Sequence, residues 1–397
     1  MTDLSPDTIF CLVGAVSADE DRMFLSQIRQ ILPEATVIGC GDTLLTNGNK
    51  WIEQGLLDAV ALDFTTEAFA RYAEGDRNRL PELLYRHDGR VVKGPPLADQ
   101  IVRVGKPPHH LFISYDYRFP FTRKKPFASL LVDYGCPFNC SFCVMSGLNY
   151  HRRPLSEVAA ELDALKSMGI QEFILWDQTF AAKRAWAMEF LELLPVGEDK
   201  FGWTCYTRPD KIDRPLAMEM ARHGCHTAIM GIETANNDTL KALRKGFTTK
   251  DTLRAFAVCR EAGITTVGTA IVGLPGETQD DVLRSIDFVC RVDPDYLSVH
   301  TAVPRSGTRL RESMVEQGLV EDSLEKMDQC GENEVLSSDS LSSYQIKSLH
   351  RRFTLRFYLR PRYLLRTAVR LLSTPSLMLE HARQGLVLML KNTARRR

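Results

Sequence analysis

Residues 130–143 read LLVDYGCPFNCSFC, an apolar run that leads into Cys136, Cys140 and Cys143 with the spacing C-x3-C-x2-C. Ten cysteines scattered over 397 residues would produce this spacing by chance in roughly six chains out of a thousand. Thiolates are soft ligands that bind zinc ions or iron–sulfur clusters. The segment therefore predicts a metal centre directly after an apolar strand.

The number of ligands decides which metal centre this spacing favours. A structural zinc site needs four ligands, and no second cysteine pair accompanies the three, although His151 could supply a fourth ligand. A cubane cluster takes one cysteine per iron, so three cysteines leave one iron open to another group. We expect a cubane cluster, and a zinc-binding module is the alternative.

Alternating strands and helices follow the cysteine segment. The segments between the apolar runs place apolar residues at helical spacing, as in residues 156–168 and 251–262. Six successive βα units predict an α/β fold with a partial (β/α)6 barrel, whose chemistry lies at the carboxyl ends of the strands. The predicted strands are 130–134, 172–176, 202–206, 227–230, 265–272 and 296–300.

A smaller unit precedes the barrel. Three short apolar runs and one helical segment form a parallel βαβ pattern, typical of a Rossmann-like domain. Asp88-Gly89 predicts a small hairpin, and the Pro-, Gly- and His-rich stretch after it predicts a linker. The predicted divisions of the chain are 1–105 for the Rossmann-like segment, 106–126 for the linker, 127–320 for the barrel and 321–397 for a helical, basic region.

Charge is distributed unevenly although the 50 basic and 50 acidic residues balance. From Tyr344 to Arg397 there are 13 Lys or Arg and one acid, Glu380, so the first 343 residues carry 37 basic and 49 acidic side chains. The basic residues alternate with Leu, Phe and Tyr, a pattern of helices that lie on anionic membranes and of segments that bind RNA. We expect first a helical cap over the acidic body, then peripheral membrane contact, and nucleic acid last.

Location can also be predicted from the sequence. No window reaches the ~18 consecutive apolar residues of a membrane span, and the first residues lack the basic segment of a signal peptide. The cysteines outside the triplet are too scattered for a secreted disulfide framework. We expect a cytoplasmic protein with reduced thiols.

The cysteine segment resembles that of the radical S-adenosylmethionine (SAM) enzymes, in which a C-x3-C-Φ-C loop follows the first barrel strand and Φ is aromatic. Phe142 occupies Φ. The resemblance implies a [4Fe-4S] cluster whose open iron binds SAM, and a 5′-deoxyadenosyl radical that abstracts hydrogen from a small-molecule substrate. It also implies a low-potential electron donor such as flavodoxin or ferredoxin.

Further motifs carry this resemblance over about residues 125–310. Asp177 in WDQTF is the candidate contact for the SAM amine, with a helix N-cap as the alternative. Glu233 in GIET would contact the ribose or methionine part of SAM, with a salt bridge to Lys245 as the alternative. Gly273 in IVGLPGE would let the adenine approach the strand closely.

Two cations complete the candidate site. Lys245 in KG would pair with the methionine carboxylate of SAM, and a solvated lysine at a helix end is equally consistent with its position. Arg208 would contact a substrate or cofactor carboxylate, and a structural ion pair with Asp210 is the alternative.

Within the family, the chain is most similar to the subgroup with an N-terminal cobalamin-binding domain. About three strands of that domain are recognisable, and its D-x-H-x-x-G motif is absent, because His87 is the one histidine before position 109. We therefore expect an enzyme that does not use cobalamin, although cobalamin bound without a protein ligand to cobalt stays open.

This expectation directs the predicted reaction. Without a methyl carrier, hydrogen abstraction would lead to oxidation, hydroxylation, cyclisation or rearrangement of a small hydrophobic substrate such as a tetrapyrrole or isoprenoid. A cobalamin-dependent C-methyltransferase is the first alternative. A tRNA methylthiotransferase is the second, and it would be expected to carry three more cluster cysteines and an RNA-binding β-domain.

Overall fold

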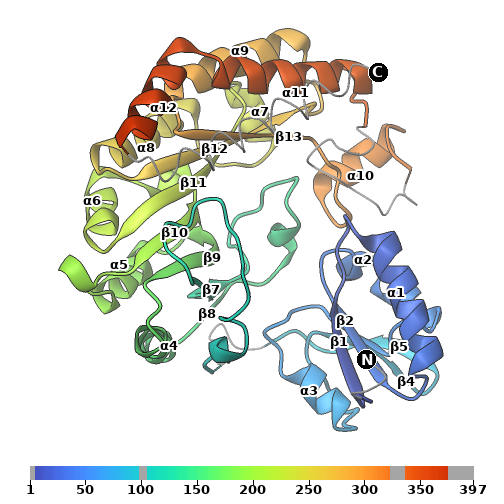
Figure 1. The fold of residues 1–397 in the computed structure, drawn as a ribbon. Helices are drawn as coiled ribbons and strands as arrows, with labels where there is room; N and C mark the ends of the chain where they lie inside the picture. Colours follow the sequence, from blue (N-terminus) through green and yellow to red (C-terminus); the bar gives the residue numbers. More distant parts are fainter. Residues whose placement is uncertain (1–4, 98–104, 322–335, 374–397) are drawn as a thin grey trace.

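Two units, one built on a mixed sheet and one on a parallel sheet, turn toward each other in the computed structural model, which describes residues 5–97, 105–321 and 336–373 (Figure 1). The smaller unit holds the N-terminal residues, and the larger one is an open barrel with helices on its outside. A pair of C-terminal helices lies against the far edge of the barrel (Figure 1). The predicted α/β fold class is confirmed.

The N-terminal sheet has the order β1-β2-β3-β4-β5, with the first three strands parallel and the last two forming the predicted antiparallel hairpin. Buried apolar side chains form one cluster on each face of this sheet. The elements are β1 Thr8–Leu12, α1 Ala18–Ile31, β2 Thr36–Cys40, α2 Leu44–Glu53, β3 Ala59–Ala61, α3 Ala68–Ala73, β4 Leu83–His87 and β5 Arg90–Lys93.

The barrel sheet has the order β13-β12-β11-β10-β9-β6, and all of its neighbouring strands are parallel. One large apolar core lies between this sheet and the helices on its convex side. The strands are β6 Ala128–Leu130, β9 Glu172–Phe180, β10 Gly202–Thr207, β11 Cys225–Glu233, β12 Thr265–Val272 and β13 Tyr296–Thr301.

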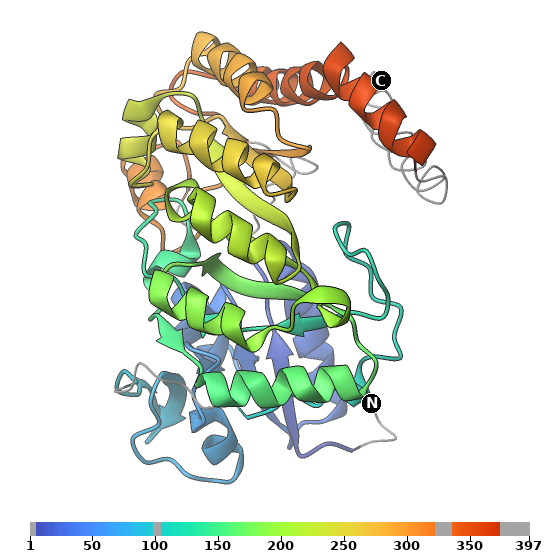
Figure 2. The ribbon, with the colours of Figure 1, turned by 90° about the vertical axis from the view of Figure 1, so that its left-hand side faces the viewer.

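The helices between the barrel strands return the chain to the amino end of the next strand, and Figure 2 shows them side by side along one face of the sheet. Thr248 and Thr278 begin two of them with capping boxes, because each side chain accepts a hydrogen bond from the third backbone N–H of its helix. These helices are α4 Leu155–Ser167, α5 Arg184–Leu193, α6 Arg214–Arg222, α7 Asn237–Ala242, α8 Thr249–Glu261 and α9 Gln279–Val292, with short 3₁₀ turns at Val144–Gly147, Gly197–Asp199 and Pro209–Lys211.

The first predicted barrel strand, 130–134, differs from the observed one. Strand β6 ends at Leu130, and Asp133–Tyr134 forms a separate short strand, β7, that pairs with β8 His151–Arg152 in an antiparallel manner. The backbone N–H groups of Val132 and Asp133 donate to Asp177 instead of continuing the parallel ladder. This break turns the chain toward the cysteine segment.

Residues 105–127 run across the amino ends of the barrel strands. This stretch, predicted as a linker, holds one 3₁₀ turn at His109–Leu111, and the backbone N–H of Lys124 donates to the carboxylate of Glu172 at 2.8 Å. The Phe119 ring contacts Trp176 of β9, and the Phe121 ring contacts Tyr296 of β13. The predicted linker therefore packs against barrel side chains.

Two helices, α11 Ser343–Tyr358 and α12 Pro361–Ser373, follow α10 Arg309–Glu316. The hydroxyl of Tyr358 donates to the carbonyl of Leu297 at 2.7 Å, so α11 is fixed against the edge strand β13. Of the predicted region 321–397, residues 322–335 and 374–397 lie outside the described residues. None of the described helices combines the length and apolar character needed to cross a membrane.

Candidate active site

The cysteine loop lies at the carboxyl ends of the barrel strands. Gly135 begins it with φ +71°, and a Cβ there would come within 1.9 Å of the carbonyl oxygen of Asn149, so only glycine fits. The backbone N–H of Ser141 donates to the Leu243 carbonyl, and the Ser141 carbonyl accepts from the N–H of Leu310. The loop is thereby held between the end of α7 and the start of α10.

The chemistry of the three thiols fits a cluster. Burial raises the pKa of the Cys136 and Cys143 thiols, so they need the positive charge of iron to ionise. The Cys136 Sγ lies 3.9 Å from the Thr179 Oγ1, and Cys140 is buried. Within the described ranges, no three His, Cys, Asp or Glu side chains are grouped closely enough to hold a single metal ion. A cubane cluster does not need such a group, because each cysteine binds a different iron.

Arg208, which follows β10, reaches the cysteine loop directly. Its Nη1 lies 3.7 Å from the Cys140 Sγ, and its guanidinium stacks over the Phe138 ring with 3.9 Å between the guanidinium carbon and the ring centroid. Asp210 accepts from its Nε at 2.9 Å, and the carbonyl of Lys245 accepts from its Nη2. The ion pair with Asp210, the alternative from the sequence, is therefore present and aims the guanidinium at Cys140.

Glu233 and Lys245 form a buried ion pair beside the loop, with 2.8 Å between Oε1 and Nζ. Burial alone would lower the pKa of Lys245, but the charges of Glu233 and Cys140 raise it above its ordinary value. Glu233 has φ +61°, an unfavourable conformation for a residue with a Cβ, and the β11–β12 register shifts next to it. The salt bridge given as the alternative in the sequence analysis is thus present. The Lys245 Nζ lies 5.2 Å from the centroid of the Phe142 ring.

Asp177 is buried beneath the strand that leads to the cysteine loop. Its Oδ1 accepts from the N–H groups of Val132 and Asp133 at 2.7 and 3.2 Å, and the residue is 2% exposed. Burial raises the pKa of Asp177 to about 7 and that of neighbouring Asp133 to about 9, the latter also through the Asp177 charge. Its carboxylate therefore fixes the strand that leads to the cysteines, and contact with the SAM amine stays a prediction.

Gly273 ends β12 with φ +87°, and a Cβ there would come within 2.8 Å of the Ile346 side chain of α11. Its N–H donates to the buried carboxylate of Glu277 at 2.8 Å. Burial raises the pKa of Glu277 to about 7. The structure thus gives Gly273 a packing role against α11, and its predicted approach to adenine stays a prediction.

The concave face of the barrel sheet is lined by aromatic side chains that the sequence did not identify as site residues. Trp176 and Tyr206 are stacked with ring centroids 5.7 Å apart, and the indole N–H of Trp176 donates to the Ser129 hydroxyl at 3.0 Å. Burial alternates along β13. Tyr296 and Ser298 face this side and are half-buried, whereas the alternate residues Leu297 and Val299 are buried in the core. This pattern shows that solvent reaches the concave face.

The carboxyl ends of the N-terminal strands face the cysteine end of the barrel. Asp42, after β2, accepts from Arg305 Nη1 at 2.6 Å. After β3, Asp63 lies 3.2 Å from His151, and the Phe64 ring contacts Tyr134 with centroids 5.3 Å apart. Ligands of parallel α/β sheets bind at such carboxyl edges. In this molecule the carboxyl edges of the two sheets face each other.

Comparison with known proteins agrees with this architecture. Residues 131–289 match the family model described as the Radical SAM superfamily. An uncharacterized methyltransferase of Pyrococcus horikoshii is 30% identical over 291 residues, which is 72% of this chain and 62% of the relative. The chain thus spans less than two thirds of that relative's length.

Solved structures share the fold. The radical SAM methyltransferase TsrM from Kitasatospora setae, with cobalamin and a [4Fe-4S] cluster bound, superposes with a TM-score of 0.63 and 24% identity over 79% of this chain and 65% of TsrM. The cobalamin-dependent radical SAM enzyme OxsB gives a TM-score of 0.69 with 14% identity over 89% of this chain and 58% of OxsB. Residues 131–289, which hold the cysteine loop and most of the barrel, thus match the radical SAM superfamily, and the chain shares the fold of the cobalamin-dependent enzymes TsrM and OxsB.

Proposed function

We propose that this protein is a radical SAM methyltransferase that transfers a methyl group to a carbon atom of a small, uncharged, largely apolar molecule. The comparisons favour this reaction, the first alternative of the sequence analysis, over an oxidation or cyclisation, because the Pyrococcus relative and TsrM are both named methyltransferases. When bound, the [4Fe-4S] cluster would supply the electron that activates SAM, and cobalamin would carry the methyl group.

One observation carries the proposal: the carboxyl edge of a Rossmann-like sheet faces the cysteine loop. A radical enzyme with a single cofactor site needs no second edge of this kind, whereas an enzyme with a methyl carrier does. The contact between Asp42 and Arg305 and the contact between Phe64 and Tyr134 span this junction. A carrier bound at the N-terminal edge would therefore lie beside the cluster.

The residues at the N-terminal edge fit a corrinoid held without a protein ligand to cobalt. Gly41, with φ +133°, packs against the Val13 carbonyl, where a Cβ would not fit, and so brings the ends of β1 and β2 close together. Val16 and Phe64 expose about half of their surface for an apolar macrocycle. The histidine of the N-terminal unit, His87, lies in the hairpin β4–β5. The absence of D-x-H-x-x-G thus limits the mode of cobalamin binding and does not by itself exclude the cofactor.

The chain's own residues have separate tasks in this proposal. Arg208 and Lys245 place positive charge beside Cys140, where a cluster with three thiolates and the SAM carboxylate bring negative charge. The aromatic side chains of the concave face, among them Trp176 and Tyr206, would orient the acceptor molecule and exclude water. Because the rings offer flat apolar surface and hydroxyl groups, they favour an aromatic or conjugated acceptor.

The test is anaerobic incubation of reconstituted protein with SAM carrying a deuterated methyl group, a reductant and a panel of small aromatic molecules. We expect a corrinoid absorbance in the purified protein and a labelled methyl group on one acceptor. A Cys140→Ala variant is the matched control and should give neither SAM cleavage nor label transfer. Production of 5′-deoxyadenosine by a corrinoid-free protein that transfers no label would refute the proposal.

A methylthiotransferase, the second alternative, is not favoured by an observation in the structure. Cys11 and Cys40 are the other cysteines before the triplet, and both lie within strands of the N-terminal sheet. Burial raises the pKa of the Cys40 thiol to about 11, which opposes its ionisation as a cluster ligand. We therefore retain methyl transfer as the proposed reaction.

A further inference from the structure

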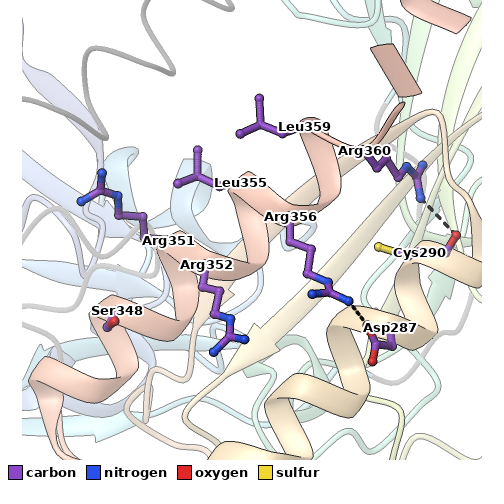
Figure 3. A pocket seen from close by; sticks show the side chains of 9 residues that line it. All are labelled: Asp287, Cys290, Ser348, Arg351, Arg352, Leu355, Arg356, Leu359 and Arg360. Atoms are coloured by element: carbon purple, nitrogen blue, oxygen red, sulfur yellow. Dashed lines mark hydrogen bonds and ion pairs between the residues drawn. The ribbon is translucent and has the colours of Figure 1, made fainter. Parts of the chain in front are cut away.

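The outer surface of α11 and α12 is strongly basic. Residues 343–373 contain eight Lys or Arg and no Asp or Glu. A shallow groove of about 840 Å³ runs along α11 beside α9, and Figure 3 shows the guanidinium groups of Arg352 and Arg356 on its α9 side. Arg351, Leu355 and Leu359 project from the opposite side of α11 in the same view. A row of cations thus lies next to a row of leucines.

The apolar row continues onto α12. Leu359, Leu364, Leu365 and Val369 each expose between 50 and 69% of their surface. Figure 2 shows α12 projecting away from the body of the molecule beyond the end of α11. Single exposed leucines are ordinary on soluble proteins, but an apolar stripe along a projecting helix marks a contact surface.

The arginines described on α11 and α12 fall into two groups, one paired with acidic side chains and one without such partners. Arg356 belongs to the first group, because it pairs with Asp287 of α9 at 3.0 Å. Arg360, Arg362 and Arg366 all contact the buried carboxylate of Asp293 at the end of α9, which fixes the position of α12. Arg351 and Arg352 have no ion-pair partner within the described residues, and Arg352 is exposed. One group therefore orients the helix, and the other offers its charge to something outside the fold.

We propose that the face defined by Arg351, Leu359, Leu365 and Val369, with Arg352 along its edge toward α9, docks the protein on an anionic lipid bilayer. Basic residues attract acidic headgroups, and aliphatic side chains of the same helical surface enter the boundary between headgroups and acyl chains. Neither signal alone anchors a protein firmly, and here both occur on adjacent helices. The inference is independent of the methyl-transfer proposal.

Charge complementarity selects this occupant. The remaining C-terminal residues 374–397 carry five Lys or Arg and one acid, so they do not neutralise a face that is already basic. The core of a protein interface is typically rich in aromatic side chains, whereas the exposed apolar side chains of this face, such as Leu359, Leu365 and Val369, are aliphatic; the exposed Tyr344 lies at the other end of α11. An anionic bilayer can bind both features, because its headgroups attract the arginines and its acyl region accepts the exposed aliphatic side chains.

The experiment is sedimentation of the full chain with vesicles, in which the bound fraction is measured at low and at high salt. We expect binding to vesicles that contain phosphatidylglycerol, weak binding to pure phosphatidylcholine, and loss of binding at high salt. The Arg351→Gln and Arg352→Gln substitutions should each lower the partition constant about fivefold. Leu365→Gln should lower it on the order of tenfold.

Two control variants carry the same chemical changes elsewhere. Leu253→Gln on α8 alters a residue with 41% exposure, and Lys241→Gln alters an exposed cation on α7; neither should change vesicle binding. All variants should keep the melting temperature of the parent protein, because the substituted side chains are largely exposed. Equal binding to both vesicle types, equal effects of test and control variants, or binding to a soluble acidic protein without vesicle binding would each overturn the proposal.

Discussion

The two main sheets of this molecule turn their carboxyl edges toward each other, yet the edges are built from different chemistry. The barrel edge holds Arg208, Glu233 and Lys245, each at most 7% exposed and each already paired. The N-terminal edge offers glycine backbone and the half-exposed side chains of Val16 and Phe64. The barrel edge is therefore preorganised for charged groups, whereas the N-terminal edge is an adaptable apolar surface.

Removing a thiol from the barrel edge tests this difference most severely. Cys140→Ala should abolish cluster binding and lower the yield of 5′-deoxyadenosine by at least about 100-fold, because each cysteine binds a separate iron. Iron content and product yield after anaerobic reconstitution measure the effect. Cys290→Ala, a change on the convex side at the end of α9, is the control, and equal losses in the two variants would contradict the assignment.

Breaking the buried ion pair should have the next largest effect. Lys245→Met leaves the Glu233 carboxylate buried without its partner, so the free energy of unfolding of the iron-free protein should fall by about 3–5 kcal/mol. Urea denaturation measures this change. Lys241→Met at an exposed position should stay within about 0.5 kcal/mol of the parent.

The double variant Glu233→Gln, Lys245→Met completes this test. It removes the unpaired charge, so it should recover a large part of the lost stability. Solvated surface pairs typically contribute under about 1 kcal/mol to stability. If Lys245→Met lowered the free energy of unfolding by no more than this, the barrel edge would not be preorganised for charge.

At the N-terminal edge the sensitive element is backbone. A Cβ on Gly41 would lie 1.9 Å from the Val13 carbonyl oxygen at φ +133°, so Gly41→Ala should cost about 2 kcal/mol or more and reduce corrinoid retention. Gly55, with φ +73°, has open space around a Cβ, and Gly55→Ala should cost only about 1 kcal/mol. Thermal unfolding and corrinoid absorbance separate the two variants.

The smallest effect is expected from Glu277, which fixes the loop after β12. Burial raises the pKa of Glu277 from its ordinary 4.5 to about 7. Its contribution to stability is therefore complete below about pH 4.5 and is lost as the pH rises through 7, because the unfolded chain releases the proton first. Glu277→Gln stays neutral, so its stability relative to the parent should rise by about 2 kcal/mol between pH 5 and pH 6.5.

Urea denaturation of the iron-free proteins at both pH values checks this expectation. A stability difference between parent and variant that does not change with pH would show that the Glu277 carboxylate is ionised in the folded protein.

Local patterns in the sequence were sufficient for most of the fold and for the position of the cysteine loop. The spacing of Cys136, Cys140 and Cys143 is a local property, and the apolar runs of the parallel strands are equally legible. The pairing of Glu233 with Lys245 was foreseen as an alternative because only 12 residues separate them. These features depend on neighbours in the chain.

Contacts between distant segments could not be predicted in this way. The hydrogen bonds of the Asp177 carboxylate to backbone N–H groups 44 and 45 residues earlier could not be predicted, whereas its contact with SAM stays a prediction. Phe119 and Phe121 were placed in a linker, since nothing local shows that their rings meet Trp176 and Tyr296 inside the barrel. The aromatic concave face was missed for the same reason.

The outermost strand of the N-terminal sheet has a consequence for how the protein behaves at high concentration. Strand β1 pairs only with β2 among the described strands, and its five residues contain no charge and no proline. Leu12 exposes 78% of its surface and Phe10 46%. Such an edge lacks the features that discourage intermolecular strand addition, so concentrated samples should be most prone to self-association here, and a lysine at position 12 should improve their solubility.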